Sequence, residues 1–440
     1  MALKALTTIG LFLLINSSWG QSVETGFLVE DPKQLHLKKI LSQQDLVVDH
    51  VDKHGFEVFG PVGLSKWLKE LNIPFSPLPE ELNKSDKSEY PTLLAIENRL
   101  KKLASENPNI LSLSSLGKSV EKNPIWMVKI SDNASIDEVE PEVKYIANMH
   151  GNEIVGRELM LLLIEELIEK YKSGDATIRE LVNNTEIFIV PTMNPDGSAK
   201  QRRGNSRWKD LNRNFPDFTT QDNQNTPNGR EPETMAIMAW QTSRHFSLSA
   251  NFHGGTECVN YPWDTSPEPA PLTELIKKLS LEYASEVPGM ANSSRFPGGI
   301  TNGNQWYEVN GGMQDWSFFW HGDLQVTIEL SQNKWPSYSD IPTFYENNRS
   351  SLLKYLRRGH QGAGFILPHK ELSGLVEIIS TETNKSLGVF PFARGEFYKI
   401  LPVGKFLFKL KFETGEASSF TMSVDSSTIS KNGNYQLVSF

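Results

Sequence analysis

Apolar and polar residues follow two different periods along the middle of the chain. Between residues 90 and 360, apolar runs typical of buried strands alternate with segments whose apolar residues have helical spacing. The runs predict strands at Ile125–Ile130, Val143–Met149, Glu186–Val190, Phe246–Phe252 and Leu324–Leu330. The spacing predicts helices at Leu93–Leu103, Gly156–Tyr171, Thr234–Trp240, Leu272–Ala284 and Asn347–Arg358. This alternation predicts an α/β domain with a mixed or mostly parallel sheet flanked by helices, and with functional loops at the carboxyl ends of its strands.

A different pattern begins after Gly362. No helix-length apolar pattern remains, and turn residues separate short alternating runs at Gly374–Ile379, Gly395–Ile400, Lys405–Phe412 and Phe420–Val424. Residues 363–440 are therefore predicted to form a small all-β sandwich.

The amino-terminal part divides into two segments. Residues 1–20 have a positive start, a short apolar core and small residues before Gln21, the pattern of a secretory signal peptide, with a buried strand or helix as the alternative. Residues 21–86 are charged, with one helix-like segment at Leu64–Leu71 and a polar, linker-like run at its end. This segment is either a prosegment-like module or an arm, and the pattern leaves both open. The catalytic α/β domain is then expected at residues 87–362.

Composition narrows the class of protein. The chain has 440 residues, 38% of them hydrophobic, and a net charge of −9 without a long basic run, which argues against nucleic-acid binding. A single cysteine, Cys258, excludes a disulfide framework and a thiolate metal site, so any metal must be held by His and carboxylates. No stretch after the signal is long enough to span a membrane. We expect a secreted or periplasmic monomer.

Three residues have the types and positions of metal ligands. His150 and Glu153 stand three apart between a predicted strand and a predicted helix, and His253 follows another strand. Two His and one Glu leave one position of a tetrahedral zinc ion open for water, as in catalytic sites. Glu329, near the end of a further strand, is a candidate general base. The alternatives are a helix cap at His150 and Glu153 and a surface carboxylate at Glu329.

Anion-binding residues follow in the next segments. Asn212 and Arg213 stand side by side and can bind a carboxylate, and Arg203 nine residues earlier can stabilise an oxyanion. Tyr307 lies in a Gly/Asn-rich stretch that predicts a mobile loop over the site. The alternatives are a solvated basic loop and an aromatic side chain packed beneath a loop.

Taken in order, six motifs resemble those of the zinc metallocarboxypeptidases, and more narrowly of the N/E, or regulatory, subfamily of carboxypeptidases D, E, M and N. They are HGNE (His150–Glu153), PTMNPDG (Pro191–Gly197), DLNRNFPD (Asp210–Asp217), NFHGG (Asn251–Gly255), the stretch Asn302–Trp316 and TIELSQNKWP (Thr327–Pro336). The resemblance covers about residues 90–440. It implies a metallocarboxypeptidase fold followed by a transthyretin-like β-sandwich.

The resemblance also implies a role for each matching residue. One Zn²⁺ ion would be held by His150, Glu153 and His253, with Glu329 as general acid and base. Arg203 would stabilise the oxyanion, and Asn212 and Arg213 would bind the substrate carboxylate. Tyr307 would be a mobile cover over the substrate. Asp264 and Gln314 would lie in a pocket for Lys or Arg. The loop Arg203–Lys209 and Trp263 depart from the family pattern.

We therefore expect an exopeptidase that releases one C-terminal residue, Lys or Arg, from peptides or proteins with a free C-terminus. The alternative with the same fold is a zinc amidase or deacylase acting on cell-wall peptides or acylated amino acids. Asn212, Arg213 and Tyr307 argue against it, because together they suit an α-carboxylate. A third hypothesis, a binding module without activity, is disfavoured because every catalytic position holds the expected residue type.

Overall fold

The computed structural model describes residues 26–41, 43, 46–49, 51, 54–60, 62–78, 90–425, 429 and 433–438. The predicted signal peptide at residues 1–20 and the polar run at residues 80–89 lie outside this part of the chain. Residues 1–80 and 81–440 form two separate compact units. No helix in the described ranges is long and apolar enough to cross a membrane.

The first unit has a four-stranded antiparallel sheet with the order β2-β3-β1-β4. Its elements are β1 (Phe27–Glu30), α1 (Leu37–Leu41), β2 (Val47–Asp49), β3 (Gly55–Phe59), α2 (Leu64–Glu70) and β4 (Phe75–Pro77). This β-α-β-β-α-β order is that of the split βαβ motif. Buried residues from both helices and from three strands form its core, including Val29, Ile40, Val48, Phe56 and Leu68. The helix predicted at Leu64–Leu71 is thus present as α2.

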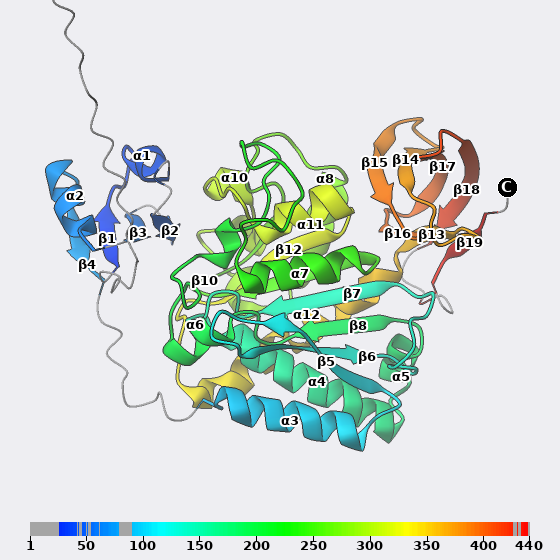
Figure 1. The fold of residues 1–440 in the computed structure, drawn as a ribbon, viewed down its shortest axis with the longest axis horizontal. Helices are drawn as coiled ribbons and strands as arrows, with labels where there is room; N and C mark the ends of the chain where they lie inside the picture. Colours follow the sequence, from blue (N-terminus) through cyan, green and yellow to red (C-terminus); the bar gives the residue numbers. More distant parts are fainter. Residues whose placement is uncertain are drawn as a thin grey trace, which may run out of the picture. The chain divides into compact units, whose positions relative to one another are not determined.

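The second unit is built on an eight-stranded mixed sheet with the order β11-β10-β12-β9-β7-β8-β6-β5 (Figure 1). Its strands are β5 (Leu111–Lys118), β6 (Pro124–Ile130), β7 (Glu142–Ala147), β8 (Glu186–Val190), β9 (Phe246–His253), β10 (Thr256–Tyr261), β11 (Ile300–Asn302) and β12 (Leu324–Ser331). The four central strands β12, β9, β7 and β8 run parallel, whereas β10, β6 and β5 join in antiparallel pairs. The predicted mixed α/β sheet is confirmed.

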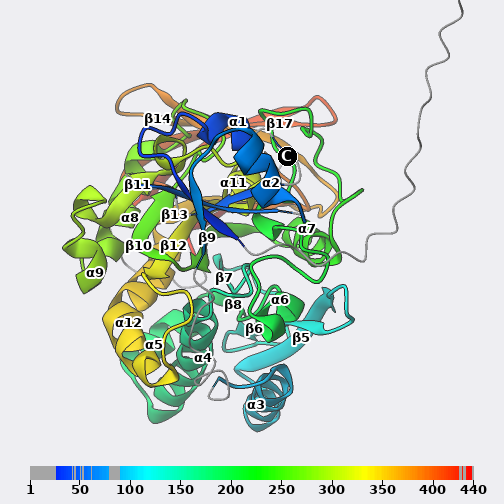
Figure 2. The ribbon, with the colours of Figure 1, turned by 90° about the vertical axis from the view of Figure 1, so that its left-hand side faces the viewer.

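Helices cover both faces of this sheet. The longer ones are α3 (Leu93–Glu106), α4 (Val155–Ser173), α5 (Ala176–Val182), α7 (Pro232–Thr242), α8 (Thr273–Ala284), α11 (Met313–His321) and α12 (Ile341–Arg357). Shorter helices are α6 (Pro195–Lys200), α9 (Pro288–Ala291), α10 (Gly303–Trp306) and the 3₁₀ turns η2 (Leu211–Arg213), η3 (Pro297–Gly299), η4 (Tyr338–Asp340) and η5 (Arg358–His360). Figure 2 shows α4, α5 and α12 grouped together.

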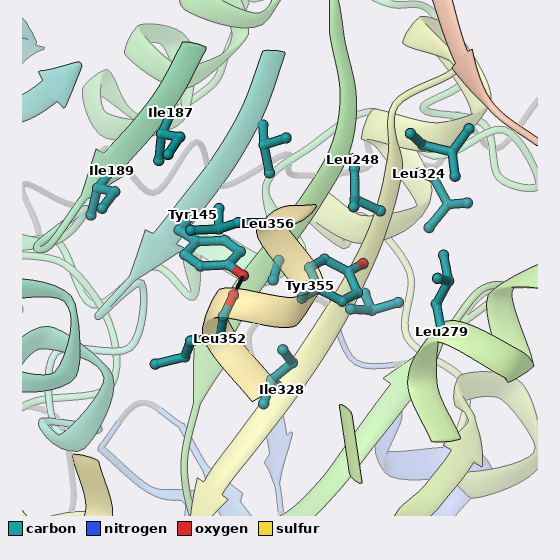
Figure 3. Packing of buried hydrophobic residues seen from close by; sticks show 14 of the residues in the cluster. Tyr145, Ile187, Ile189, Leu248, Leu279, Leu324, Ile328, Leu352, Tyr355 and Leu356 are labelled. Atoms are coloured by element: carbon teal, nitrogen blue, oxygen red, sulfur yellow. Dashed lines mark hydrogen bonds between the residues drawn. The ribbon is translucent and has the colours of Figure 1, made fainter. Parts of the chain in front are cut away.

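Alternate residues of the central strands point into two apolar cores, one on each face of the sheet. On β7, Tyr145 packs with α4, α8 and α12, whereas Ile146 packs with α7 and α11 on the other face. The Tyr145 hydroxyl donates to the Leu352 carbonyl oxygen at 2.8 Å within the first core (Figure 3). Strands buried on both faces read as continuous apolar runs, which is why the runs at β7, β8 and β9 were visible in the sequence.

The carboxyl-terminal strands form two further sheets, as the loss of helical patterning predicted. One has the order β16-β13-β19 and the other β15-β14-β17-β18. Their strands are β13 (Gly362–Ile366), β14 (Gly374–Ser380), β15 (Ser386–Phe392), β16 (Glu396–Ile400), β17 (Gly404–Phe412), β18 (Ala417–Val424) and β19 (Tyr435–Leu437). Phe365 of one sheet contacts the rings of Phe392 and Phe420 of the other, so the inner faces pack on each other.

These strands are joined to the α/β sheet through a buried lysine. Lys399 of β16 donates to the Gly322 carbonyl, and its ammonium lies over the rings of Phe318 and Phe390 at 4.4 and 4.3 Å. Burial lowers the pKa of Lys399 to about 7. Lys399 therefore lies in the packed contact between the carboxyl-terminal strands and the α/β part of the second unit.

Candidate functional site

Three metal-ligating side chains converge where the central strands end. β7 ends at Ala147, and the turn that follows carries His150 and Glu153 before α4 begins at Val155. β9 is the parallel neighbour of β7 and ends on His253. Because parallel neighbours end at the same edge of a sheet, two histidines 103 positions apart come into contact.

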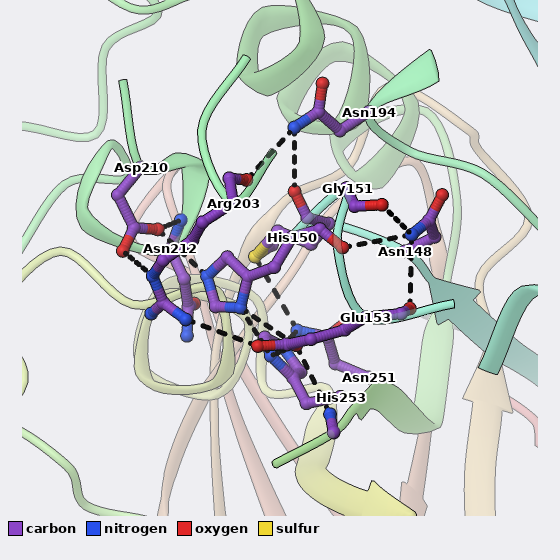
Figure 4. A network of polar contacts seen from close by, with 12 residues as sticks. Asn148, His150, Gly151, Glu153, Asn194, Arg203, Asp210, Asn212, Asn251 and His253 are labelled. Carbon is purple, nitrogen blue, oxygen red and sulfur yellow. Dashed lines mark hydrogen bonds and ion pairs between the residues drawn. The ribbon is translucent and has the colours of Figure 1, made fainter. Parts of the chain in front are cut away.

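The donor atoms of these three residues form a compact triangle (Figure 4). His150 Nδ1 lies 3.0 Å from Glu153 Oε2 and 2.9 Å from His253 Nδ1, and His253 Nδ1 lies 3.0 Å from Glu153 Oε2. A tetrahedral zinc ion with bonds of about 2.0 Å spaces its ligands roughly 3.3 Å apart. All three side chains are buried, and two imidazoles with one carboxylate suit zinc. The predicted ligand set therefore comes together and fits such an ion.

The turn that carries His150 and Glu153 is held by its own backbone and by Asn148. Asn148 adopts a left-handed conformation, and its amide donates to the carbonyl oxygens of His150, Gly151 and Glu153 at 3.0, 3.3 and 3.1 Å. A Cβ atom on Gly151 would lie 2.1 Å from the carbonyl carbon of Gly197. Glycine is required there because any side chain would displace the turn.

Outer hydrogen bonds orient both imidazole rings. A histidine that binds metal through Nδ1 carries its proton on Nε2 and donates it to a neighbouring acceptor. His150 Nε2 lies 3.0 Å from Asp210 Oδ1, and His253 Nε2 lies 2.6 Å from the Asn251 side-chain amide. The atom that faces the ring is Asn251 Nδ2, while Asn251 Oδ1 is buried without a hydrogen-bond partner in the described structure. Rotating this amide by 180° would place Oδ1 at the ring as the acceptor that a protonated Nε2 requires.

Arg203 balances the buried negative charge of this site. Its Nε donates to Asp210 Oδ2 at 3.0 Å, and its Nη1 lies 3.3 Å from Glu153 Oε1. Burial alone would raise the pKa of Asp210, but Arg203 and His150 together hold that pKa well below its ordinary value. Asp210 is therefore ionised and links Arg203 to His150.

Asn212 and Arg213 lie in the turn η2, which Asp210 begins. The Asp210 carboxylate caps the turn by accepting from the Asn212 backbone N–H at 2.8 Å. Asn212 Oδ1 accepts from the Met313 backbone N–H at 3.0 Å, and Arg213 Nη1 donates to the Asn212 carbonyl at 3.0 Å. The predicted carboxylate-binding pair is thus fixed beside Arg203 and the metal ligands.

Asp264 and Gln314 are buried and contact each other next to this pair. Asp264 Oδ1 accepts from Gln314 Nε2 at 3.0 Å and from Asn260 Nδ2 at 2.9 Å. A Cβ atom added to Gly312 would lie 3.6 Å from both Asn212 Oδ1 and Asp264 Oδ2, so this glycine separates the two predicted subsites. Burial raises the pKa of Asp264 to about 6.

Glu329 and Tyr307 complete the set of predicted residues. Glu329 is the register partner of His253 on the parallel strand β12, so both side chains leave the sheet on the same face. Tyr307 follows α10, and its backbone N–H donates to the Gly303 carbonyl at 2.9 Å. The stretch Asn302–Trp316 was expected to be a loop, but α10 and the start of α11 occupy much of it. Its expected mobility stays a prediction.

Several site residues were missed at the sequence level. Asp210 and Asn251 contact the two imidazoles. Both lie inside the family motifs named above, but no function was predicted for either residue. Asp315 was also missed, and its Oδ2 accepts from the backbone N–H groups of Asp264 and Thr265 at 2.8 and 2.9 Å. A signal for Asp210 was available, because it stands between Arg203 and Arg213 in the chain.

Known proteins resemble this chain in sequence and in fold. Residues 96–351 match the family model described as zinc carboxypeptidase. Human carboxypeptidase D is 40% identical over 333 residues, which is 70% of this chain but only 24% of that protein. Mouse carboxypeptidase M is 36% identical over 71% of this chain and 75% of its own length. For the mouse carboxypeptidase N catalytic chain the identity is 33%, over 74% of this chain and 81% of the relative.

Two solved structures support the fold. Carboxypeptidase A from Helicoverpa armigera aligns with a TM-score of 0.60 at 18% identity, over 76% of this chain and 97% of that one. Thrombin activatable fibrinolysis inhibitor aligns with a TM-score of 0.58 at 17% identity, over 76% of this chain and 98% of that one. Because the family model covers more than half of the chain and relatives above 30% identity match over most of their length, the chain belongs to the zinc carboxypeptidase family.

Proposed function

We propose that this chain is a zinc-dependent carboxypeptidase that releases one C-terminal Lys or Arg from peptides. The observation that carries the proposal is the position of Asn212 and Arg213 beside the three metal ligands, with the Asp264 carboxylate across Gly312. A free C-terminal carboxylate suits the first pair and a cationic side chain suits Asp264. An internal peptide bond offers no such carboxylate, which explains exopeptidase action and disfavours the amidase alternative.

His150, Glu153 and His253 hold one zinc ion in this proposal. When bound, the ion supplies a Lewis acid that polarises the scissile carbonyl and lowers the pKa of an attacking water. Asp210 and Asn251 keep the two imidazoles in the tautomer that ligation requires.

Glu329 and Arg203 serve the reaction itself. Glu329, on the same face as His253, accepts a proton from the attacking water and then delivers it to the nitrogen of the departing amine. The Arg203 guanidinium, already within 3.3 Å of Glu153, supplies positive charge where the carbonyl oxygen becomes negative. Tyr307 closes over the bound substrate. The substrate's carboxylate, bound by Asn212 and Arg213, sets the register of the scissile bond.

The remaining segments receive roles consistent with this activity. Residues 1–20 direct export, and residues 363–440 form the transthyretin-like sandwich implied by the two packed sheets. Residues 21–86 contain a separate folded unit, and we assign it the role of an inhibitory prosegment joined to the catalytic domain by the polar run at 80–89. The molecule acts as a monomer.

Asp210→Asn is expected to weaken zinc binding by about 10- to 100-fold, because the neutral amide loses the negative charge that strengthens the hydrogen bond from His150 Nε2 and pairs with Arg203. Competition with a chelating dye measures the affinity. The matched control is Asp222→Asn, an exposed carboxylate outside the site. Unchanged zinc affinity in Asp210→Asn would contradict the proposed arrangement.

Glu329→Gln is expected to reduce kcat by about 10²- to 10⁴-fold while the protein retains stoichiometric zinc. The amide has the same shape but cannot accept the proton. Steady-state kinetics and metal analysis measure the two quantities, and the exposed Glu169→Gln serves as control. Normal turnover in Glu329→Gln excludes this residue as the base.

Selectivity for a basic residue is expected to depend on pH through Asp264. With a pKa of about 6, this carboxyl is neutral in acid and charged above that value. The ratio of kcat/KM for hippuryl-Arg to that for hippuryl-Phe should therefore rise between about pH 5 and pH 7 and then level off. Taking the ratio removes the effect of any other ionisable group that changes kcat/KM equally for both substrates.

Asp264→Asn should lower this ratio by roughly tenfold or more and remove its dependence on pH, because a neutral amide loses the charge attraction. The exposed Glu169→Gln should leave both the ratio and its dependence on pH unchanged. Faster cleavage of hippuryl-Phe by the unmodified enzyme at neutral pH would refute the assignment of a basic pocket.

Cleavage in the polar run is expected to raise kcat/KM if residues 21–86 inhibit the enzyme. Lys84 and Lys87 flank Asp86 and offer sites for limited trypsin treatment. Activity should increase in step with appearance of the shortened chain, and Lys84→Gln with Lys87→Gln should prevent both. Complete cleavage without a change in activity would leave the unit without an inhibitory role.

A further inference from the structure

Three carboxylates meet at the opposite end of β7 from the metal-ligand turn. Asp132, Glu138 and Glu140 lie in the segment between β6 and β7, and one oxygen from each lies within 4.8 Å of the others. We call these three residues the loop cluster. β7 begins at Glu142 and its other end leads to His150, so the loop cluster belongs to the amino-terminal edge of the strand. None of its members has a part in the proposed reaction.

One carboxylate oxygen of each member of the loop cluster is buried without a hydrogen-bond partner among the described residues: Glu140 Oε2, Glu138 Oε2 and Asp132 Oδ1. Glu140 as a whole is only 2% exposed. Asp132 and Glu138 are half-buried, and Glu138 Oε1 accepts from Asn133 Nδ2 at 3.1 Å. An unpaired buried polar atom costs free energy, and three facing carboxylates repel one another. Burial, reinforced by Glu138 and Asp132, raises the pKa of Glu140 to about 8.

A neighbouring acidic cluster shows how the chain neutralises such charge elsewhere. Glu142 and Glu186 form a second group with Asp137, but Lys129 pairs with Glu186, and Arg244 lies 3.3 and 3.5 Å from Glu142 and Glu186. Lys129 is further engaged by the Ile136 carbonyl. In the described part of the chain, no Lys, Arg or His forms an ion pair with the loop cluster. The second group therefore has cations in direct contact, whereas Lys129 lowers the pKa of Glu140 only from a distance and forms no ion pair with the loop cluster.

The backbone of the segment is already fixed around the loop cluster. The Asp132 N–H donates to the Val182 carbonyl at 3.2 Å and the Ala134 N–H to the Asn109 carbonyl at 3.1 Å. The Glu138 N–H donates to Glu186 Oε1 at 2.8 Å. These hydrogen bonds hold the loop in the conformation that brings the three carboxylates together. Binding an ion between them would therefore need no large rearrangement of the loop.

We propose that Asp132, Glu138 and Glu140 bind one Ca²⁺ ion, separate from the catalytic metal site. Ligands that are oxygen only and negatively charged select a hard divalent cation over zinc. Calcium suits them better than magnesium, because it accepts irregular geometry and completes its shell with carbonyl groups and water, whereas magnesium demands a near-ideal octahedron. The ion joins the β6–β7 loop to the amino-terminal end of β7 and stabilises the α/β sheet from that side.

Titration of CaCl₂ into the zinc-loaded protein tests the proposal by calorimetry. We expect one site with a Kd of about 10⁻⁴ to 10⁻³ M or tighter, and weaker binding of MgCl₂. Glu140→Gln should weaken Ca²⁺ binding at least tenfold, and Asp132→Asn should do so independently. The exposed Glu169→Gln is the matched control and should bind Ca²⁺ as the unmodified protein does.

Thermal unfolding is a second test, because the proposal predicts the direction in which Ca²⁺ and the Glu140→Gln change shift the Tm. Without Ca²⁺, Glu140→Gln should unfold at the same or a higher temperature than the unmodified protein, because the amide replaces a buried carboxyl that must either take up a proton or face the charges of Asp132 and Glu138. Saturating Ca²⁺ should raise the Tm of the unmodified protein by roughly 2 °C or more and leave Glu140→Gln unchanged. Equal binding by both proteins, absence of binding up to about 10 mM, or tighter binding of Mg²⁺ would each overturn the proposal.

Discussion

The parallel pairing of β7 with β9, and of β9 with β12, is the constraint on which the site depends. Register places Ala147 beside Phe252 and His253 beside Glu329, so three strands deliver their chemical groups to one edge. A slip of one residue would turn His253 or Glu329 to the opposite face of the sheet. The two apolar cores hold this register, because every residue of β7 and β9 is buried.

Charge compensation is the second condition for such a buried site. Glu153 and Asp210 are both almost completely enclosed, and each is within hydrogen-bond distance of a histidine and of Arg203. A buried carboxylate is also paired with a positive charge inside the sheet, where Lys144 Nζ lies 2.9 Å from Asp323 Oδ2. At the loop cluster, where Glu140 Oε2 is buried without a hydrogen-bond partner among the described residues, we propose that a bound cation supplies the compensating charge.

Much of the fold was predictable because its elements are strongly patterned. The strand at Glu186–Val190 was predicted with its observed bounds, and the helix predicted at Gly156–Tyr171 is α4 with small changes at its ends. Short elements were harder: α10 and α11 lie in a Gly/Asn-rich stretch whose composition favours a loop. There, the backbone is held by distant groups, since the Val309 N–H donates to the Asp264 carbonyl and Asn212 accepts from Met313. Contacts of that kind leave no periodic signal in the chain.

The sequence alone determined five strands of the central sheet and the main helices beside them, although not β5, β10 and β11. It also determined the His, Glu, Arg and Asn types that suit a metal and a carboxylate, and the family resemblance that relates them. These properties depend on local spacing and residue chemistry, both of which can be read along a chain. Only the tertiary structure decided that His150, Glu153 and His253 form a triangle with sides near 3 Å, and that Asp210 and Asn251 orient its imidazoles. The reason is physical: these distances depend on the register between strands separated by a hundred residues and on packing against both faces of the sheet. No segment contains that information by itself.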